Sequence, residues 1–117
     1  SSSVIETLIE SELRSTQSNG IKMKVRYKNG VQEVLNLNQR VIYIGRASSF
    51  GRFDQDVEIS RKHLLIKLNN TGEVFIEDQG STNGSFLNGK KIRGMHQVNP
   101  NDIVKVGDTE LQIEAIA

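Results

Sequence analysis

Closely spaced hairpin turns constrain the fold of this chain more than any other feature. From residue 21 onward, apolar and polar residues alternate with a period of two, as at residues 23–28. Four turn sequences interrupt the alternation, at Asn29-Gly30, Asn69–Gly72, Asn88-Gly89 and Gly107-Asp108. Asn-Gly favours a two-residue type I′ turn, which requires a positive φ at both central residues. Short strands joined by tight turns predict an all-β fold, an antiparallel two-sheet β-sandwich.

The first twenty residues have a different pattern. Apolar residues recur near helical spacing, at Val4, Ile5, Leu8, Ile9 and Leu13. We predict a short N-terminal helix of about ten residues, followed by a linker. The expected division is therefore 1–20 for the helix and linker and 21–117 for the sandwich. A helix this short is marginal in water, so it either packs on the domain or frays.

The composition restricts the possible functions. The 117 residues suffice for one sandwich domain, and fifteen basic against fourteen acidic residues give a formal charge of +1. This balance argues against bulk electrostatic binding of nucleic acid or an anionic membrane. The absence of cysteine excludes disulfides and suits a cytoplasmic or otherwise intracellular location. The longest clearly apolar run, Val41–Ile44, is too short to span a bilayer. Since the chain begins Ser-Ser-Ser-Val, we expect a domain of a longer protein.

Hydrogen-bond donors gather at three places in the chain. Gly45-Arg46 follows the apolar run, Ser60-Arg61-Lys62-His63 precedes the next predicted strand, and Ser81-Thr82-Asn83-Gly84 follows the strand after it. Guanidinium groups bind phosphate through a planar fork, and hydroxyl and amide groups supply further donors. The sequence therefore predicts a binding site for a tetrahedral oxyanion.

The order Gly45-Arg46, Ser60-x-x-His63 and Ser81-x-Asn83-Gly84 resembles the forkhead-associated (FHA) domain, a phosphothreonine-peptide reader. The resemblance covers about residues 22–115 and implies a sandwich of about eleven strands. It also implies that Arg46, Ser60 and Arg61 contact the phosphate, while Thr82 and Asn83 hold the flanking peptide backbone.

Other residues of these segments have supporting roles by the same resemblance. Gly45, His63 and Gly84 would support the binding loops. Glu58 would contact the ligand side chain three residues after the phosphothreonine, where its charge should favour Lys or Arg. The expected partner is a phosphothreonine-containing protein or peptide, bound by a monomeric signalling domain without cofactor.

Two alternatives remain open. Ser60 and His63 permit a nucleophile–base pair in a small hydrolase, but a triad also needs an orienting acid and an oxyanion hole. The resemblance instead makes His63 structural, so we expect no enzyme activity and no catalytic residue. The second alternative is a degenerate FHA-like scaffold that binds no phosphopeptide.

Three further patterns predict no additional site. Residues 84–91 nearly match the nucleotide-binding P-loop, but Lys91 stands where the Mg²⁺-ligating hydroxyl is required. His63 and His96 lack paired-ligand spacing, so no metal is expected. The basic cluster at residues 90–96 has no interleaved aromatic residues, so nucleic acid is not an expected partner.

Overall fold

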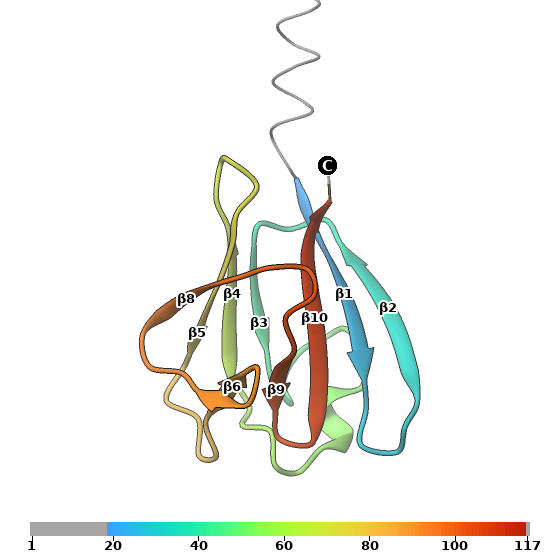
Figure 1. The fold of residues 1–117 in the computed structure, drawn as a ribbon. Coiled ribbons are helices and arrows are strands. Elements are labelled where there is room, and N and C mark those ends of the chain that lie inside the picture. The colour runs from blue at the N-terminus through green and yellow to red at the C-terminus, as the bar shows by residue number, and fades with distance from the viewer. Residues whose placement is uncertain (1–18, 117) are drawn as a thin grey trace, which may run out of the picture.

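The structure is a computed structural model that describes residues 19–116 (Figure 1). These residues form ten β-strands and one 3-10 helix. The elements are β1 (Gly20–Arg26), β2 (Gln32–Leu37), β3 (Val41–Ile44), η1 (Phe53–Gln55), β4 (Leu64–Leu68), β5 (Val74–Asp78), β6 (Ser85–Leu87), β7 (Lys90–Lys91), β8 (Met95–Val98), β9 (Val104–Val106) and β10 (Thr109–Ile116). The helix predicted within residues 1–20 lies outside the described residues, apart from the last two positions of its linker.

Within the described residues, the strands form two antiparallel sheets. One has six strands in the order β2-β1-β10-β9-β6-β7, and the other has four in the order β3-β4-β5-β8. The predicted two-sheet sandwich is thereby confirmed. The described residues contain ten strands, one fewer than the expected eleven, and residues 45–63 form local turns and η1 without a strand. Gln55, Asp56 and Ile59 each donate a backbone N–H to a carbonyl three residues earlier.

The period-two pattern places one side chain in two between the sheets. In β1, Ile21, Met23 and Val25 are buried, while Lys24 and Arg26 are exposed. The inward residues of the other strands complete one apolar core. Burial of apolar surface is the main favourable contribution to folding, so this alternation fixes which face of each strand turns inward.

Two Asn-Gly turns that look alike in the sequence adopt different geometries. At Asn88-Gly89 both residues have a positive φ, 50° and 85°, as a type I′ turn requires. At Asn29-Gly30 only the glycine does, with φ 85°. Tyr27 donates its N–H to the carbonyl of Val31 and accepts from Gly30, which closes a three-residue loop. The predicted two-residue turn was therefore wrong at this position.

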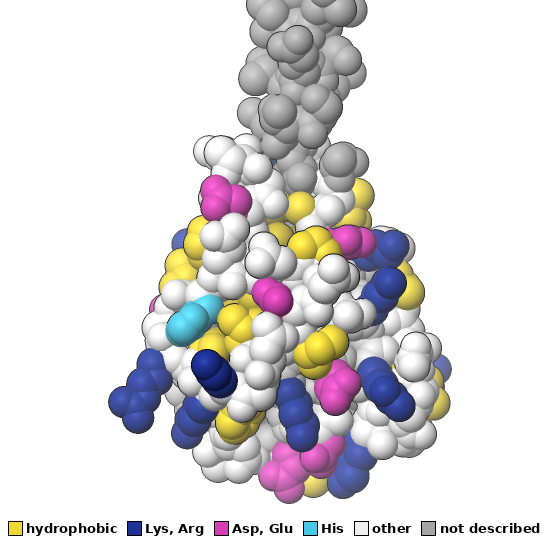
Figure 2. Space-filling view, in the orientation of Figure 1, with side chains coloured by type: hydrophobic (Ala, Val, Ile, Leu, Met, Phe, Trp, Pro, Cys, Tyr) yellow, Lys and Arg dark blue, Asp and Glu magenta, His cyan; other side chains and the backbone are white. Residues whose placement is uncertain are grey.

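The arrangement of the strands separates the chain ends from the loops of interest. The ends of β1 and β10 that adjoin the termini lie together at one end of the sandwich (Figure 1). The loops after β3, before β4 and after β5 lie at the opposite end. Lys and Arg side chains are mixed with Asp and Glu on the face in Figure 2, consistent with the net charge of +1. Within residues 19–116, no helix has the length and hydropathy required to cross a membrane.

Candidate functional site

The three donor-rich segments meet at the end of the sandwich opposite Gly20 and Ile116. The Arg46 N–H donates to the Ser60 carbonyl at 3.1 Å, and the His63 N–H donates to the Ile44 carbonyl at 2.8 Å. The Thr82 N–H donates to Ser60 Oγ at 3.0 Å. Two backbone–backbone hydrogen bonds therefore join the end of β3 to the loop before β4, and a backbone-to-side-chain bond joins that loop to the loop after β5.

Gly45 allows the first two segments to approach closely. A Cβ atom at this position would lie 1.9 Å from the carbonyl oxygen of Arg61. No side chain fits there unless the backbone moves, because such a contact is far inside van der Waals distance. Because Gly45 has no Cβ, the backbone at Arg46 can lie next to the segment that carries Ser60.

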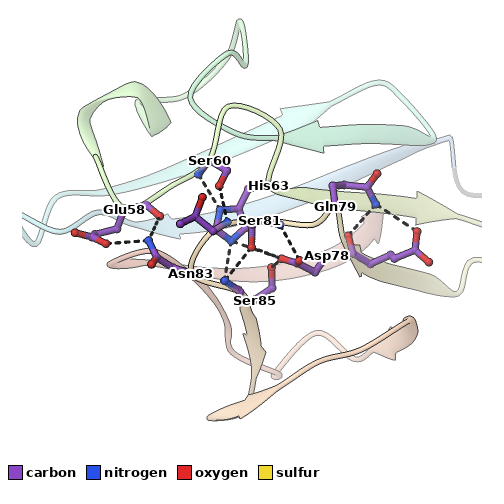
Figure 3. A network of polar contacts seen from close by, with 11 residues as sticks. Glu58, Ser60, His63, Asp78, Gln79, Ser81, Asn83 and Ser85 are labelled. Carbon is purple, nitrogen blue, oxygen red and sulfur yellow. Dashed lines mark hydrogen bonds and ion pairs between the residues drawn. The ribbon is translucent and has the colours of Figure 1, made fainter.

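His63 lies between the second and third segments and links them (Figure 3). Its side chain is 0% exposed. Nδ1 accepts the Ser60 N–H at 3.0 Å, so the ring hydrogen is on Nε2, which donates to the Gly84 carbonyl at 2.8 Å. Both ring nitrogens are occupied by backbone groups and neither contacts Ser60 Oγ. This arrangement braces two loops and differs from a nucleophile–base pair.

Asp78, which the sequence analysis did not identify, organises the third segment. Its carboxylate accepts the Ser81 and Ser85 hydroxyls at 2.6 Å each and the Ser81 N–H at 3.0 Å. Burial alone would raise the pKa of Asp78, but these hydrogen bonds outweigh it and hold the pKa below its ordinary value. Ser81 Oγ in turn accepts the Gly84 N–H at 2.9 Å. An aspartate three residues before a loop serine is a turn pattern that could have identified this residue.

The exposed rim of the site carries donors that have no acceptor within the described part of the chain. Arg46 and Arg61 are exposed, and neither guanidinium group forms a hydrogen bond or ion pair within residues 19–116. Ser60 Oγ accepts from Thr82, which leaves its own hydroxyl hydrogen available. Lys62, by contrast, places its ammonium group 4.0 Å from the centroid of the Tyr43 ring. The rim can therefore supply two guanidinium groups and one hydroxyl to an anion.

Glu58 and Asn83 contact each other across the rim (Figure 3). The Asn83 amide nitrogen donates to the Glu58 carbonyl and to Glu58 Oε2, each at 2.9 Å. Both amide hydrogens are used, which fixes the amide orientation and leaves Asn83 Oδ1 as an acceptor. Thr82 is exposed beside it.

Asp56 holds the Glu58 segment in position and was also missed by the sequence analysis. It is only 3% exposed. Oδ1 accepts the Glu58 N–H at 3.0 Å, and Oδ2 accepts the Asp108 N–H at 2.7 Å and the Thr109 hydroxyl at 2.9 Å. Its partners on the β9–β10 turn are over fifty residues away in the sequence, so no local pattern identifies this contact.

The structure also places the remaining patterns noted in the sequence. Gly84 has φ +83°, and a Cβ there would lie 2.7 Å from Lys91 Cε. Asn88-Gly89 connects β6 to β7, so the P-loop-like residues form a hairpin without a following helix. His96 Nε2 contacts the Arg93 carbonyl at 2.8 Å. Within residues 19–116, no group of three or more His, Cys, Asp or Glu residues could hold a metal ion.

Comparisons with known proteins agree on one family. The FHA domain family model matches residues 42–107. Vacuolar protein sorting-associated protein 64 of Saccharomyces cerevisiae is 44% identical over 61 residues, covering 50% of this chain and 9% of that protein. The chain therefore spans less than a tenth of the length of this relative.

Solved structures share the fold. The FHA domain of a Chlamydia trachomatis protein is 27% identical, with a TM-score of 0.71 and coverage of 84% of this chain and 99% of that chain. A structure from a study of phosphothreonine-dependent FHA domain interactions is 21% identical, with a TM-score of 0.68 and coverage of 84% and 98%. Mycobacterium tuberculosis EmbR, solved with a low-affinity phosphopeptide, is 22% identical, with a TM-score of 0.65 and coverage of 99% and 30%.

Proposed function

Because the chain belongs to the FHA domain family, we propose that it is a phosphothreonine-peptide-binding module acting in phosphorylation-dependent protein–protein interaction. One observation carries the proposal. Within residues 19–116, Arg46, Arg61 and the Ser60 hydroxyl offer donors without an acceptor, and His63 braces the loop that carries Ser60. A phosphorylated threonine brings close to two negative charges and three acceptor oxygens, which such a rim would neutralise and pair.

Each rim residue has a defined role in the proposed complex. Arg46 and Arg61 bind the phosphate through charge-assisted hydrogen bonds, and Ser60 donates its hydroxyl to a third oxygen. Asn83 holds the ligand backbone by accepting an N–H at Oδ1, since both of its amide hydrogens are already donated to Glu58. Thr82 flanks the same stretch of backbone.

The proposed site should bind a phosphate in preference to a carboxylate, although both are anions. A carboxylate offers two oxygens and one charge, so a donor at the rim would remain unpaired, which is costly once it is buried by the ligand. Aspartate and glutamate should therefore fail as mimics. Burial of the threonine γ-methyl is worth about 0.8 kcal/mol, and the restricted threonine rotamer adds to it, so the preference over phosphoserine should be about tenfold.

The parent protein of this domain is proposed to be an intracellular signalling or regulatory protein with a Ser/Thr-phosphorylated partner. A domain of this kind binds its partner without chemical change. Both ring nitrogens of His63 are hydrogen-bonded to backbone groups, which agrees with a structural role for His63 and not with a role as a general base. Phosphate binding at the rim needs positive charge only at that place, so it is compatible with a domain whose net charge is +1.

The decisive experiment is a randomised phosphothreonine-peptide screen, followed by calorimetric titration of the selected peptide into wild-type, Arg46→Ala and Arg93→Ala domains. Loss of Arg46 should cost on the order of 2–4 kcal/mol, or about 30- to 1,000-fold in affinity. Arg93, an exposed arginine outside the rim, is the matched control and should leave affinity unchanged. Binding of the Arg46 variant within twofold of wild type would refute the assignment. Failure of every phosphopeptide in the screen would favour the scaffold alternative.

The pH dependence of binding offers an independent check. The second pKa of a phosphate ester lies near 6, so the dianion is the dominant ligand form at pH 7.5 and the minor form at pH 5.5. Affinity should fall over this interval. Affinity that stays constant would mean that the second charge of the phosphate is not recognised.

A further inference from the structure

The two sheets of the sandwich have different outer faces. An antiparallel sheet that faces water on one side normally alternates between apolar inward and polar outward residues. In the four-stranded sheet, eight side chains of the described strands point outward, and five of these are apolar. The five, which we call the outer apolar face, are Val41, Tyr43, Leu65, Phe75 and Met95. These strands therefore carry apolar residues on both faces, a pattern typical of strands that are buried on both sides.

The six-stranded sheet provides the contrast. The outward residues of β1 are Lys22, Lys24 and Arg26. Lys22 forms an ion pair with Glu114 at 3.7 Å on the adjacent strand β10, where Arg26 is paired in register with Glu110. This outer face is laced with opposite charges, as expected of a surface that remains in water. The apolar character of the other sheet is thus specific to that sheet.

The outer apolar face is also substantially exposed within the described chain. Val41 is 49%, Tyr43 43% and Met95 49% exposed, while Leu65 and Phe75 are partly buried between them. Register places Tyr43 opposite Leu65, and Lys67 opposite both Val41 and Phe75. Glu77 lies between Leu65 and Met95 in the same way, so the apolar side chains share this face with one lysine and one glutamate. Three large apolar side chains that are each more than 40% exposed on one face still favour a covering partner.

We propose that this face is covered by the N-terminal segment of the same chain, residues 4–13, packed as an amphipathic helix. In a helix its apolar residues would share one side, with Glu12 among them, and a ten-residue helix needs a partner because it is marginal alone. The segment 1–18 carries three glutamates and one arginine. The face it would meet carries two ammonium groups, Lys67 between Val41 and Phe75 and Lys62 over the Tyr43 ring, against one carboxylate, Glu77. The charges therefore favour this partner.

The dimensions agree with the proposal. A helix of about ten residues is about 15 Å long, and four strands span about 14 Å between the outermost two. Gly20 lies against Leu37, since a Cβ on Gly20 would be 2.7 Å from the Leu37 carbonyl oxygen. Val41 follows Leu37 by four residues, so it lies within about 15 Å of that point. Residues 14–19 can extend about 20 Å, which is enough to bring the segment onto the face.

A double-mutant cycle in the full chain tests the contact. The variants are Leu8→Ser on the segment, Val41→Ser on the face, and Val34→Ser as the matched control. Val34 is a strand valine that is 51% exposed on the outer face of the other sheet, so its replacement carries the same loss of β-propensity. Val41→Ser should lower the melting temperature by about 4 °C more than Val34→Ser.

The coupling between the substitutions decides the result. Leu8→Ser combined with Val41→Ser should lower the melting temperature by clearly less than the sum of the two single effects, whereas Leu8→Ser and Val34→Ser should add. Nuclear Overhauser contacts between the Leu8 methyl groups and the Tyr43 ring should accompany the coupling. Additive effects at Val41 would overturn the proposal. The proposal would also be overturned if the coupling disappeared when the protein is diluted and sedimentation analysis showed a dimer. That result would mean that a second copy of the chain covers the face.

Discussion

Replacement of Gly45 by alanine tests how tightly the site is built. The new Cβ would lie 1.9 Å from the Arg61 carbonyl oxygen, whereas a normal carbon–oxygen contact is about 3.3 Å. The end of β3 and the loop before β4 would therefore have to separate by about 1.4 Å. The bonds from Arg46 to Ser60 and from Ala47 to Arg61, at 3.1 and 3.2 Å, would then exceed hydrogen-bond length. Together with the overpacking, this should cost about 2–4 kcal/mol of unfolding free energy.

Gly30→Ala is the matched control for this substitution. Gly30 has φ +85° and nothing within 4 Å of its ideal Cβ, so alanine there should cost about 1 kcal/mol from the left-handed backbone alone. Thermal and urea unfolding should show a loss of about 10–20 °C for Gly45→Ala and clearly less for Gly30→Ala. Phosphopeptide affinity should fall only in the Gly45 variant. Equal stability of the two variants would refute the steric reasoning.

Three further predictions concern single residues of the site. His63→Ala should lower both the melting temperature and peptide affinity, because the Ser60 N–H and the Gly84 carbonyl each lose a buried partner worth about 1–3 kcal/mol; an unchanged melting temperature would place His63 outside the loop support. The depressed pKa of Asp78 means that its stabilising contribution is present above the unfolded-state value near 3.9 and is lost as pH falls through the folded-state value, so Asp78→Asn should flatten the acid limb of the stability profile. Glu58→Lys should shift the residue selected three positions after the phosphothreonine from basic to acidic, and a wild-type domain that selects Asp there would show that Glu58 is misplaced.

The fold was predictable because its determinants are local. Alternation fixes which side chains face the core, and Asn-Gly sequences identify turns. The turn at Asn29-Gly30 shows the limit of this reasoning, since loop length there depends on how Tyr27 pairs with Val31. A sequence motif alone does not distinguish a two-residue from a three-residue loop.

Only the exposed residues of the candidate site could be proposed from the sequence. Arg46, Ser60 and Asn83 belong to short motifs that the resemblance could identify. Asp56 was not predictable, because its partners on the β9–β10 turn come into reach only after the sheets assemble. Buried carboxylates that position loops are recognised from tertiary contacts, whereas exposed hydrogen-bond donors are recognised from their residue type.

The pairing of the first and last strands has a mechanical consequence. Gly20 is directly opposite Ile116 at one end of the β1–β10 ladder, so tension applied through the flanking chain would pull these two residues apart across the strands. Hydrogen bonds of an antiparallel ladder lie along that direction and would break one after another instead of sharing the load. The domain should therefore yield at low force when it is stretched through Gly20 and Ile116, starting at the end of the ladder opposite the loops that carry Arg46 and Ser60. Single-molecule pulling through residues 19 and 116 would measure this unzipping directly.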